Sequence, residues 1–388
     1  MAPAQQTSAS QTPHISPAEL SYLYDSLALP EGPIRPDGRS PTQFRPLTAE
    51  TGIVPGANGS ARIGFADGSE AIVGVKAEVE RTLASDALDF RQLQELQQDD
   101  GGAGGDDDAG EGGRDGSQAA TGQSAWVQMS IEIPGFRDDD ALPVFLSEMM
   151  RESLVGSNVG TDSPMAGGLK SRLVINRRWH WRLYIDILLL SPPASYPLPL
   201  LSLTTHLALL STRLPKLKSH GEEDPLFDDD WNAAEYLYPR PSKQNLTRQA
   251  RPPVTLLVVS AGNNVIFDPT REEIAVADAV LAVSIARDDG KDGDDGHLKL
   301  LSIRTIDPPS RLTNHGIPNS ENAATLAVVA GEEPPPQTAP VEENVPGVWK
   351  PSRGGVSRRV ISKMVKMVLE KGGVGDEVME GLAGVDVS

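Results

Sequence analysis

Alternating apolar and polar positions near the start of the chain predict a β-hairpin. Residues 61–65 place apolar side chains at every second position, which is the period of a strand with one buried face. Asp67 and Gly68 follow, a pair typical of a two-residue turn in which both central positions need a positive φ. Residues 72–79 are β-branched and apolar, so we expect the return strand to lie in the middle of a sheet.

A helix is expected just before this hairpin, over residues 16–30. Ser16 is a suitable N-cap, Pro17 suits the first helical position, and Glu19 completes a capping box. Four apolar side chains then share one face at helical spacing: Leu20, Leu23, Tyr24 and Leu27. We interpret this stripe as a face that docks onto the sheet. A face that binds a partner is the less favoured alternative.

The remaining pattern repeats strands followed by a helix. Strands are expected over residues 127–133, 173–175, 181–190, 254–261, 265–268, 279–286 and 297–306, and helices over residues 141–154, 200–214 and 356–369. The helix over residues 200–214 is apolar on every side, which indicates burial. This order predicts an α+β fold in two halves.

Composition sets the expected boundaries of these halves. The first half is predicted over residues 34–215 and the second over residues 252–371, with a long connection over residues 216–251. Segments poor in apolar residues are expected to be disordered or irregular. They are a tail over residues 1–15, an acidic glycine-rich insertion over residues 85–122, and further insertions over residues 287–296 and 308–351. The chain is expected to end in a helix over residues 356–371 and a tail over residues 372–388.

Charge and composition exclude several classes of protein. The formal net charge is −19. Ten acids against two arginines over residues 86–115, and six acids without a base over residues 222–230, together carry −14 of it. The rest of the chain is near neutral and leaves RNA binding possible. The chain has no cysteine, which excludes disulfides, thiolate catalysis and cysteine-ligated metals. Its apolar runs are too short for a membrane helix. The first residues have no signal-peptide core, so we expect a soluble intracellular protein.

Four short motifs, in their order and spacing, resemble one family. They are Arg-Pro-Asp-Gly-Arg at residues 35–39, Phe-Arg-Pro at 44–46, Asn-Gly-Ser-Ala-Arg at 58–62 and Val-Gly-Val-Lys-Ala-Glu-Val at 73–79. Together they look like the opening of the RNase PH family, which forms phosphorolytic ribonucleases and the six-membered ring of the RNA exosome. The helical motif Ser-Tyr-Leu-Tyr-Asp-Ser-Leu at 21–27 narrows the resemblance to a ring subunit of the fungal exosome. It implies an RNase PH-like fold of two βαβ-type halves, of the ribosomal protein S5 domain 2-like kind.

The resemblance also says where phosphorolysis would take place. Active members hold inorganic phosphate in an Asp-Gly-Gly-Ser/Thr-Arg loop between a strand and a helix, through backbone N–H groups and the arginine. Here residues 191–199 read Ser-Pro-Pro-Ala-Ser-Tyr-Pro-Leu-Pro, without a glycine or an arginine. Four prolines also remove four N–H donors. We therefore expect no catalytic residue in this chain.

Active members of the family also use acids after a strand of the second half, to bind a metal and assist proton transfer. Asp268 and Asp278 lie in such positions. Without a phosphate site beside it, we interpret Asp268 as a residue whose side chain caps the following turn, before Pro269. The six histidines are scattered without metal-ligand spacing. We expect no bound metal and no cofactor.

Contact with RNA remains open. Basic residues gather before and around the expected strand at 181–190: Arg151, Lys170, Arg172, Arg177 and Arg178. In the family that the chain resembles, this region of the non-catalytic subunits lies near the central channel, where basic side chains can bind phosphates of a single strand. The alternative is ordinary: solvated arginines flank a strand, and the neighbouring Trp179 and Trp181 belong to the core.

The resemblance implies a non-catalytic ring subunit of the exosome core. Its expected role is a scaffold that lines the RNA channel in 3′–5′ RNA processing and degradation, including maturation of ribosomal RNA. Expected partners are other RNase PH-fold subunits in a hexameric ring, S1/KH cap subunits and single-stranded RNA, with no membrane. The nucleus, nucleolus and cytoplasm are the expected locations. Two alternatives are a phosphate-dependent 3′–5′ exoribonuclease of the RNase PH type and an acidic, partly disordered interaction protein of another assembly.

Overall fold

The computed structural model of the chain describes residues 15–82, 122–156, 168–221, 223–238, 251–288, 297–306, 349 and 356–386. The tail predicted over residues 1–15 and the insertions predicted over residues 85–122, 287–296 and 308–351 lie almost entirely outside these residues. No helix in the described part of the chain is long and apolar enough to cross a membrane.

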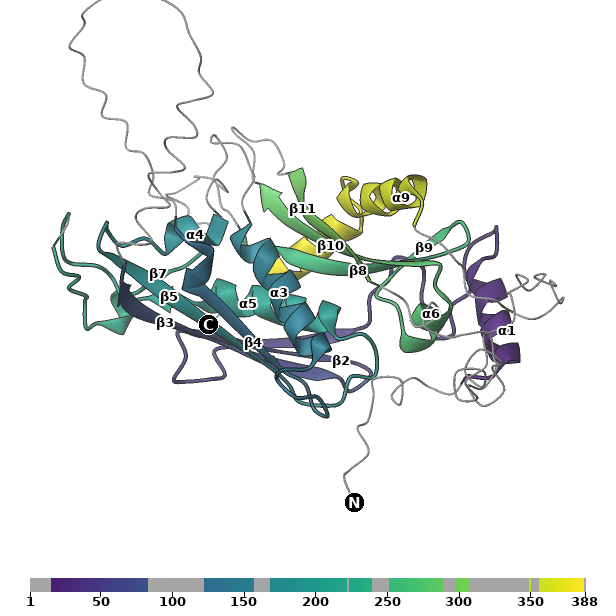
Figure 1. Cartoon of the computed structure of the whole chain (residues 1–388), viewed down its shortest axis with the longest axis horizontal. Helices are drawn as coiled ribbons and strands as arrows, with labels where there is room; N and C mark the ends of the chain where they lie inside the picture. Colours follow the sequence, from purple (N-terminus) through teal and green to yellow (C-terminus); the bar gives the residue numbers. More distant parts are fainter. Residues whose placement is uncertain are drawn as a thin grey trace, which may run out of the picture.

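The first half is a five-stranded mixed sheet (Figure 1). Its strands lie in the order β1 (Leu47–Thr51), β2 (Gly59–Phe65), β3 (Glu70–Arg81), β5 (Trp179–Leu189) and β4 (Val127–Glu132). Only β4 and β5 pair in parallel. Between these two strands the chain passes through α3 (Ala141–Val155) and α4 (Gly168–Arg172), because a parallel pair needs a crossover connection. This is the βαβ unit of the first half.

The predicted hairpin is present, but its turn differs from the prediction. The Phe65 N–H group donates to the Ser69 carbonyl at 2.8 Å, and the Gly68 N–H group donates to the Phe65 carbonyl at 3.0 Å. Gly68 has a φ of +84°, whereas Asp67 is not among the described residues with positive φ. The loop therefore spans residues 66–68 and ends in a left-handed glycine, which is the common three-residue hairpin loop.

Helix α5 (Leu198–Ser211) lies between the two halves. Every residue of α5 except Leu210 is buried, as its apolar surface on every side predicts. It packs against β2 and β3 of the first sheet and against β8 (Val254–Ala261) of the second. Buried side chains of both halves form one continuous hydrophobic core around it. The helix ends three residues before the predicted end because the chain enters β6 (Arg213–Leu214).

The second half is a four-stranded antiparallel sheet. Its strands lie in the order β11 (His297–Ile306), β10 (Ala279–Asp288), β8 and β9 (Asn264–Phe267). Since β9 and β10 are both antiparallel to β8, they run in the same direction on its two sides, joined through α6 (Arg271–Val276). The second half is thus a split βαβ unit, and the α+β class of the whole chain is confirmed.

Two helices at the end of the chain cover the second sheet, where a helix and a tail were predicted. Helix α9 (Arg358–Leu369) packs on β8, β10 and β11, and α10 (Val374–Ala383) packs on α9. Gly372 turns the chain with a φ of +69°. Val374, Met379 and Leu382 are then buried, at a spacing that suits a helix. The prediction of a tail over residues 372–388 was wrong for this segment.

The predicted long connection contains an antiparallel hairpin, which we call the acidic hairpin (residues 213–236). Strand β6 pairs with β7 (Glu235–Tyr236) at its base, and Leu217 and Phe227 form a bridge further along. The Lys218 N–H group donates to the Leu226 carbonyl at 2.7 Å. By contrast, the strand predicted over residues 173–175 is reduced to a single bridge at Val174, after the short helix α4.

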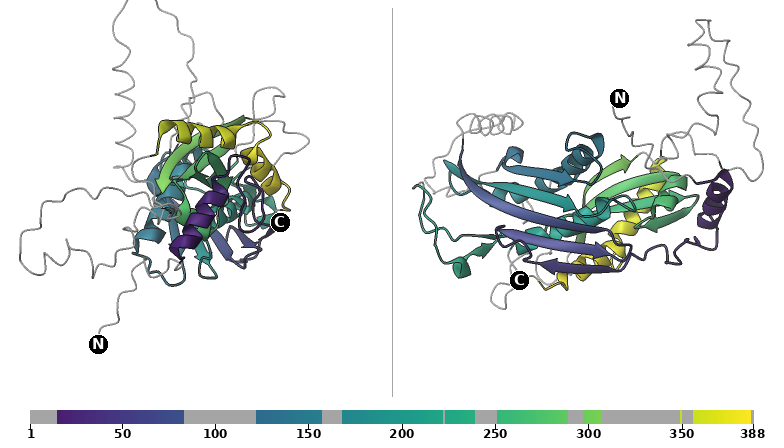
Figure 2. Two further views of the ribbon diagram at one scale, coloured as in Figure 1. Left: turned by 90° about the vertical axis from the view of Figure 1, so that its right-hand side faces the viewer. Right: turned by 90° about the horizontal axis from the view of Figure 1, so that it is seen from below.

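Helix α1 (Pro17–Leu27) begins with the predicted capping box between Ser16 and Glu19. It docks beside α6 and β9 at one end of the molecule (Figure 2). Asn264 of β9 donates its side-chain N–H groups to the carbonyls of Leu27 and Leu29 at 2.7 and 2.8 Å. The apolar stripe of α1 thus packs on the body of the protein.

Candidate functional site

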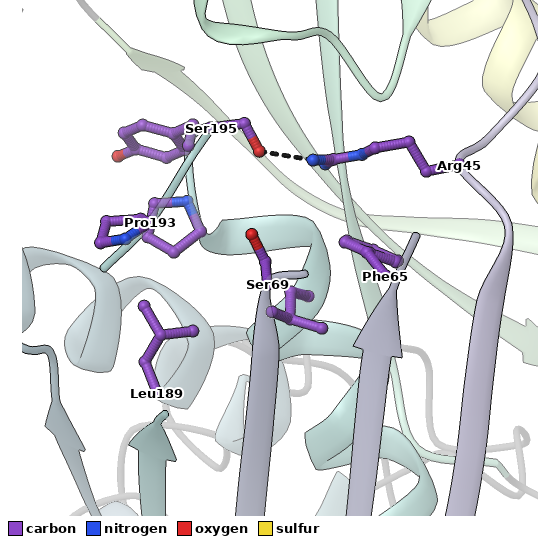
Figure 3. Close-up of a pocket in the computed structure, with 9 residues that line it drawn as sticks. Arg45, Phe65, Ser69, Leu189, Pro193 and Ser195 are labelled. Atoms are coloured by element: carbon purple, nitrogen blue, oxygen red, sulfur yellow. Dashed lines mark hydrogen bonds between the residues drawn. The ribbon is translucent and has the colours of Figure 1, made fainter. Parts of the chain in front are cut away.

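A small cavity lies at the C-terminal end of β5, where the loop to α5 passes the ends of the sheet strands (Figure 3). Phe65 lines it from the sheet, and Pro193, Ser195 and Tyr196 line it from the loop. The cavity has a volume of about 10 Å³, enough for about one water molecule. Among the described residues that line it, only Arg45 carries a positive charge.

Proline occupies much of the backbone that would offer N–H groups to an anion. Pro197 is the N-cap of α5 and Pro199 is its second residue, and neither has an N–H group. An anion site at a helix start depends on such groups. No side chain caps this helix start. The start of α5 thus lacks two of the backbone donors, and any side-chain cap, that an anion site at a helix start would use.

Arg45 directs its guanidinium at protein acids. Its Nε and Nη2 atoms donate to the two carboxylate oxygens of Asp268 at 2.9 and 2.6 Å, a bidentate pair. Its Nη1 atom donates to Asp67 and to the Ser195 hydroxyl, each at 2.6 Å (Figure 3 shows the Ser195 bond). Burial alone would lower the pKa of Arg45, but hydrogen bonds and the charges of Asp268 and Asp67 raise it. Four of its five N–H groups are therefore occupied.

Asp268 is the centre of these contacts. It follows β9, is fully buried and accepts from Arg39 Nη1 at 2.8 Å as well as from Arg45. The Arg45 backbone N–H group adds a further bond at 2.9 Å. Asp268 has a φ of +47°, the only positive φ among described non-glycine residues. Aspartate tolerates this region better than most residues, and the surrounding arginines hold it there.

Arg35 makes a second buried pair beside it. Its Nε and Nη2 atoms donate to the Glu273 carboxylate at 2.7 and 2.9 Å, and both side chains are fully buried. Its Nη1 and Nη2 atoms also reach the carbonyls of Phe267 and Asp268 at 3.1 and 3.0 Å. The segment before β1 is thus tied to the second half of the molecule.

The arginine and carboxylate side chains in this region carry no net positive charge. We call the set the arginine–carboxylate network: Arg35, Arg39, Arg45, Asp37, Asp67, Asp268 and Glu273. Three arginines against four carboxylates give 3 − 4 = −1. Because its arginines already have carboxylate partners, the network repels rather than attracts a further anion.

The predicted roles of the acids are partly corrected. Asp268 does not cap the following turn; Thr270 caps α6, with Glu273 completing the capping box. Asp278 has other partners, the Gly262 N–H group at 2.7 Å and the Tyr24 hydroxyl at 3.2 Å. Within the described residues no group of three or more acids or histidines could hold a metal ion.

The structure places the five residues predicted to contact RNA near the opposite, N-terminal end of β5. Arg151 is in α3, Lys170 and Arg172 are in α4, and Arg177 and Arg178 directly precede β5. Since β5 has 11 residues, this end lies roughly 33 Å from the cavity. The two candidate sites are therefore separate.

Two of these five residues, Arg151 and Arg172, make contacts within the protein. Arg151 Nη2 pairs with Glu148 at 2.7 Å, and its Nη1 atom donates at 3.2 Å to the Ser124 carbonyl in η2 (Ser124–Trp126). Arg172 donates to the Leu237 carbonyl at 3.0 Å and lies over the ring of Tyr238 at 4.9 Å. Arg177 and Arg178 are exposed, and Lys170 is half-buried.

The arginine–carboxylate network was missed from the sequence. Arg35, Arg39 and Arg45 belong to recognised motifs, but their partners are 223 to 238 residues away in the chain. The available signal was three arginines within eleven residues of an acidic chain. Asp224 was also missed. It accepts a hydrogen bond from Trp179 Nε1 at 3.1 Å, which places it at the N-terminal end of β5.

Comparison with known proteins identifies relatives by sequence. No family model matches the chain. The chain is 33% identical to "Exosome complex component RRP42" of Saccharomyces cerevisiae, over 70% of this chain and 81% of that protein. It is 30% identical to "Exosome complex component rrp42" of Schizosaccharomyces pombe, over 70% of this chain and 78% of that protein.

A solved structure described as an Archaeoglobus fulgidus exosome with RNA bound to the active site contains a similar chain, with a TM-score of 0.46 and 19% identity. The similarity covers 80% of this chain and 92% of the archaeal one. The two yeast relatives decide the assignment, because each is matched at 30% identity or more over most of its length. The chain belongs to the family of the exosome complex component RRP42.

Proposed function

We propose that the chain is a non-catalytic ring subunit of the RNA exosome. It serves as a scaffold and lines the RNA channel in 3′–5′ processing and degradation of RNA, including maturation of ribosomal RNA. Its partners are the other RNase PH-fold subunits of a hexameric ring, the S1/KH cap subunits and single-stranded RNA. The proposal includes action in the nucleus, nucleolus and cytoplasm.

The observation that carries the proposal is the closure of the arginine–carboxylate network. Arg45 is the only cation among the described residues lining the cavity, and it is bound to Asp268, Asp67 and Ser195. Losing one preorganised donor to a reacting anion costs on the order of a hundred-fold in rate. Here the loop adds no glycine and no arginine to replace Arg45. The alternative, a phosphate-dependent exoribonuclease, lacks its phosphate site.

The sheets support an assembled rather than a solitary protein. Within the described residues, β1 and β4 are the edges of the first sheet and β11 is one edge of the second. The other edge strand of the second sheet, β9, already binds the N-terminal segment through Phe267 and Asn264. Open edges favour pairing with other chains. Val144 and Phe145 on α3 are also exposed, at 46% and 43%. In a ring, neighbouring subunits would cover these strand edges and apolar side chains.

Assembly can be tested by co-expressing the full chain with the other exosome core proteins and weighing the product by native mass spectrometry. We expect one copy of this chain in a multi-subunit complex, whereas the chain expressed alone self-associates or precipitates. Omitting one RNase PH-fold subunit at a time is the control that identifies the direct neighbours.

The opposite result would be equally clear. A chain that remains a stable monomer at high concentration, and is absent from every co-expressed complex, contradicts the proposal. If the chain is recovered instead with an unrelated set of proteins, the result supports the alternative hypothesis of an acidic interaction protein of another assembly.

A further inference from the structure

The tip of the acidic hairpin folds back onto the N-terminal end of β5. Asn176, just before this strand, donates its side-chain N–H to the Glu223 carbonyl at 2.9 Å. The rings of Trp181 and Phe227 lie 5.0 Å apart at an angle of 45°. The hairpin therefore lies beside Arg177 and Arg178, two residues predicted to contact RNA, which stay exposed.

Asp224 at this tip places its carboxylate between two donors. Its Oδ1 atom accepts from Trp179 Nε1 at 3.1 Å and lies 3.8 Å from Arg178 Nη2. The guanidinium of Arg81 lies 5.2 Å from the centre of the Trp179 ring. Phosphate oxygens of nucleic acids accept from the same kinds of N–H donor. The carboxylate thus occupies a position that suits an RNA phosphate.

The contact is exposed and exchangeable. The Arg178 and Asp224 side chains are 55% and 73% exposed, and exposed ion pairs contribute little to stability. An RNA strand brings several phosphates and bases that stack on aromatic and guanidinium surfaces. It can therefore replace one carboxylate at a small cost. The hairpin opposes this replacement, because residues 222–230 carry six acids and no base.

We propose that Arg81, Arg178 and Trp179 form a binding surface for single-stranded RNA, and that Asp224 competes with RNA phosphate for it. This inference rests on the proposed function, since it names residues and a control element for the RNA contact of an exosome subunit. The acidic hairpin then keeps weakly bound or short RNA off this surface, while a longer strand displaces its tip.

The test uses the full chain, in complex with its ring neighbours if it is insoluble alone, and a fluorescein-labelled oligouridine of about 12 nucleotides. Fluorescence anisotropy gives Kd at several salt concentrations. We expect Asp224→Asn to lower Kd about two- to fivefold. Asp229→Asn is the matched control. It makes the same charge change on an exposed residue of the same hairpin, with no hydrogen bond or ion pair to β5 recorded among the described residues.

Two variants test the donors. Arg178→Gln should raise Kd and reduce the slope of log Kd against log salt by about 0.7, the loss of one phosphate contact. Trp179→Phe keeps an aromatic ring but removes the N–H group, so it should raise Kd without unfolding the protein. Circular dichroism confirms the fold of each variant.

Three outcomes would overturn the inference. Equal effects of Asp224→Asn and Asp229→Asn would mean general repulsion without competition at Trp179. An unchanged Kd in both Arg178→Gln and Trp179→Phe would place RNA elsewhere. An acidic peptide that binds this surface where oligouridine does not would assign it to a protein partner. In each case, continued assembly with exosome subunits would leave the proposed function intact.

Discussion

The two ends of β5 use the same chemistry with opposite consequences. At the C-terminal end, Arg45 binds Asp268 in a bidentate pair whose side chains are 9% and 0% exposed. At the N-terminal end, Arg178 lies 3.8 Å from Asp224, and both side chains are more than half exposed. Breaking a buried pair leaves an uncompensated charge inside the protein, whereas water replaces an exposed partner easily. Burial therefore closes one end to anions, and exposure leaves the other end exchangeable.

This difference in burial distinguishes the two candidate sites of the molecule. The cavity lies in the loop where the resemblance led us to expect a phosphate site, yet Arg45 is hydrogen-bonded to protein carboxylates there. At the surface around Trp179, the Arg178 and Asp224 side chains are exposed, which is why we propose that RNA can replace the carboxylate there. The following predictions test this contrast, from the largest expected effect to the smallest.

Breaking the buried pair should be costly. Asp268→Asn leaves Arg39 and Arg45 without their shared carboxylate, and we expect a loss of about 3–5 kcal/mol in the free energy of unfolding. Urea denaturation followed by circular dichroism measures it. Glu70→Gln is the control, because it breaks the pair of Arg62 and Glu70, whose side chains are 42% and 37% exposed. That loss should stay below about 1 kcal/mol. Similar small losses in both variants would refute the contrast.

The protein interior should also be sensitive to acid, through His206 of α5. This side chain is buried, its ring nitrogens have no hydrogen-bond partner of normal geometry among the described residues, and burial, aided by the charge of Arg251, lowers its pKa from 6.5 to about 4. Above pH 6.5 the imidazole is neutral in both states, so it contributes no pH dependence. Between pH 6.5 and 4 only the unfolded chain binds the proton, so stability falls, by about 3 kcal/mol in total.

Urea denaturation of the protein and of His206→Leu at pH 7, 5.5 and 4.5 isolates this effect, since other groups titrate equally in both. As the pH falls, the unfolding free energy of the protein with His206 should decrease more than that of His206→Leu. A difference that stays constant with pH would show that His206 is not held neutral.

Arg172 should behave as a structural residue although it was predicted to contact RNA. Arg172→Met removes the hydrogen bond to the Leu237 carbonyl and the contact with Tyr238, and we expect a loss of about 1–2 kcal/mol. The Kd for oligouridine should not change. Lys170→Met is the control, because it removes one positive charge from the same short helix without removing the contacts of Arg172. A weaker affinity with unchanged stability would return Arg172 to the RNA-contact residues.

The smallest effect is expected where the pair is exposed. Asp224→Asn should change the free energy of unfolding by less than about 1 kcal/mol, although it raises RNA affinity. Thermal unfolding followed by circular dichroism checks this. A large destabilisation would mean that Asp224 anchors the acidic hairpin and does not act as an exchangeable competitor.

Local pattern predicted most of the fold, because strands, amphipathic helices and caps depend on neighbouring residues. The buried helix α5 and the capping box at Ser16 are examples. Helix α10 was missed because its glycines at 375 and 381 weaken the helical signal. The acidic hairpin was missed because its charges and proline resemble a loop.

The candidate site was less predictable for a physical reason. The loop at residues 191–199 could be recognised as unfit for phosphate from its residues, once the family resemblance had indicated where phosphate would bind. The commitment of Arg45 to Asp268 could not, because the two residues are 223 positions apart and only the packing of the two halves brings them together. The same holds for Trp179 and Asp224, 45 positions apart.

The most direct test of the central claim is an assay for nucleoside diphosphates. The purified full chain, and a complex whose other subunits lack nuclease activity, are incubated with labelled single-stranded RNA, inorganic phosphate and magnesium, and the products are separated by chromatography. The closed arginine–carboxylate network predicts neither nucleoside diphosphates nor monophosphates above the level of a blank. Phosphate-dependent release of diphosphates by this chain, lost in a folded Arg45→Lys variant, would contradict the account and make the protein an exoribonuclease.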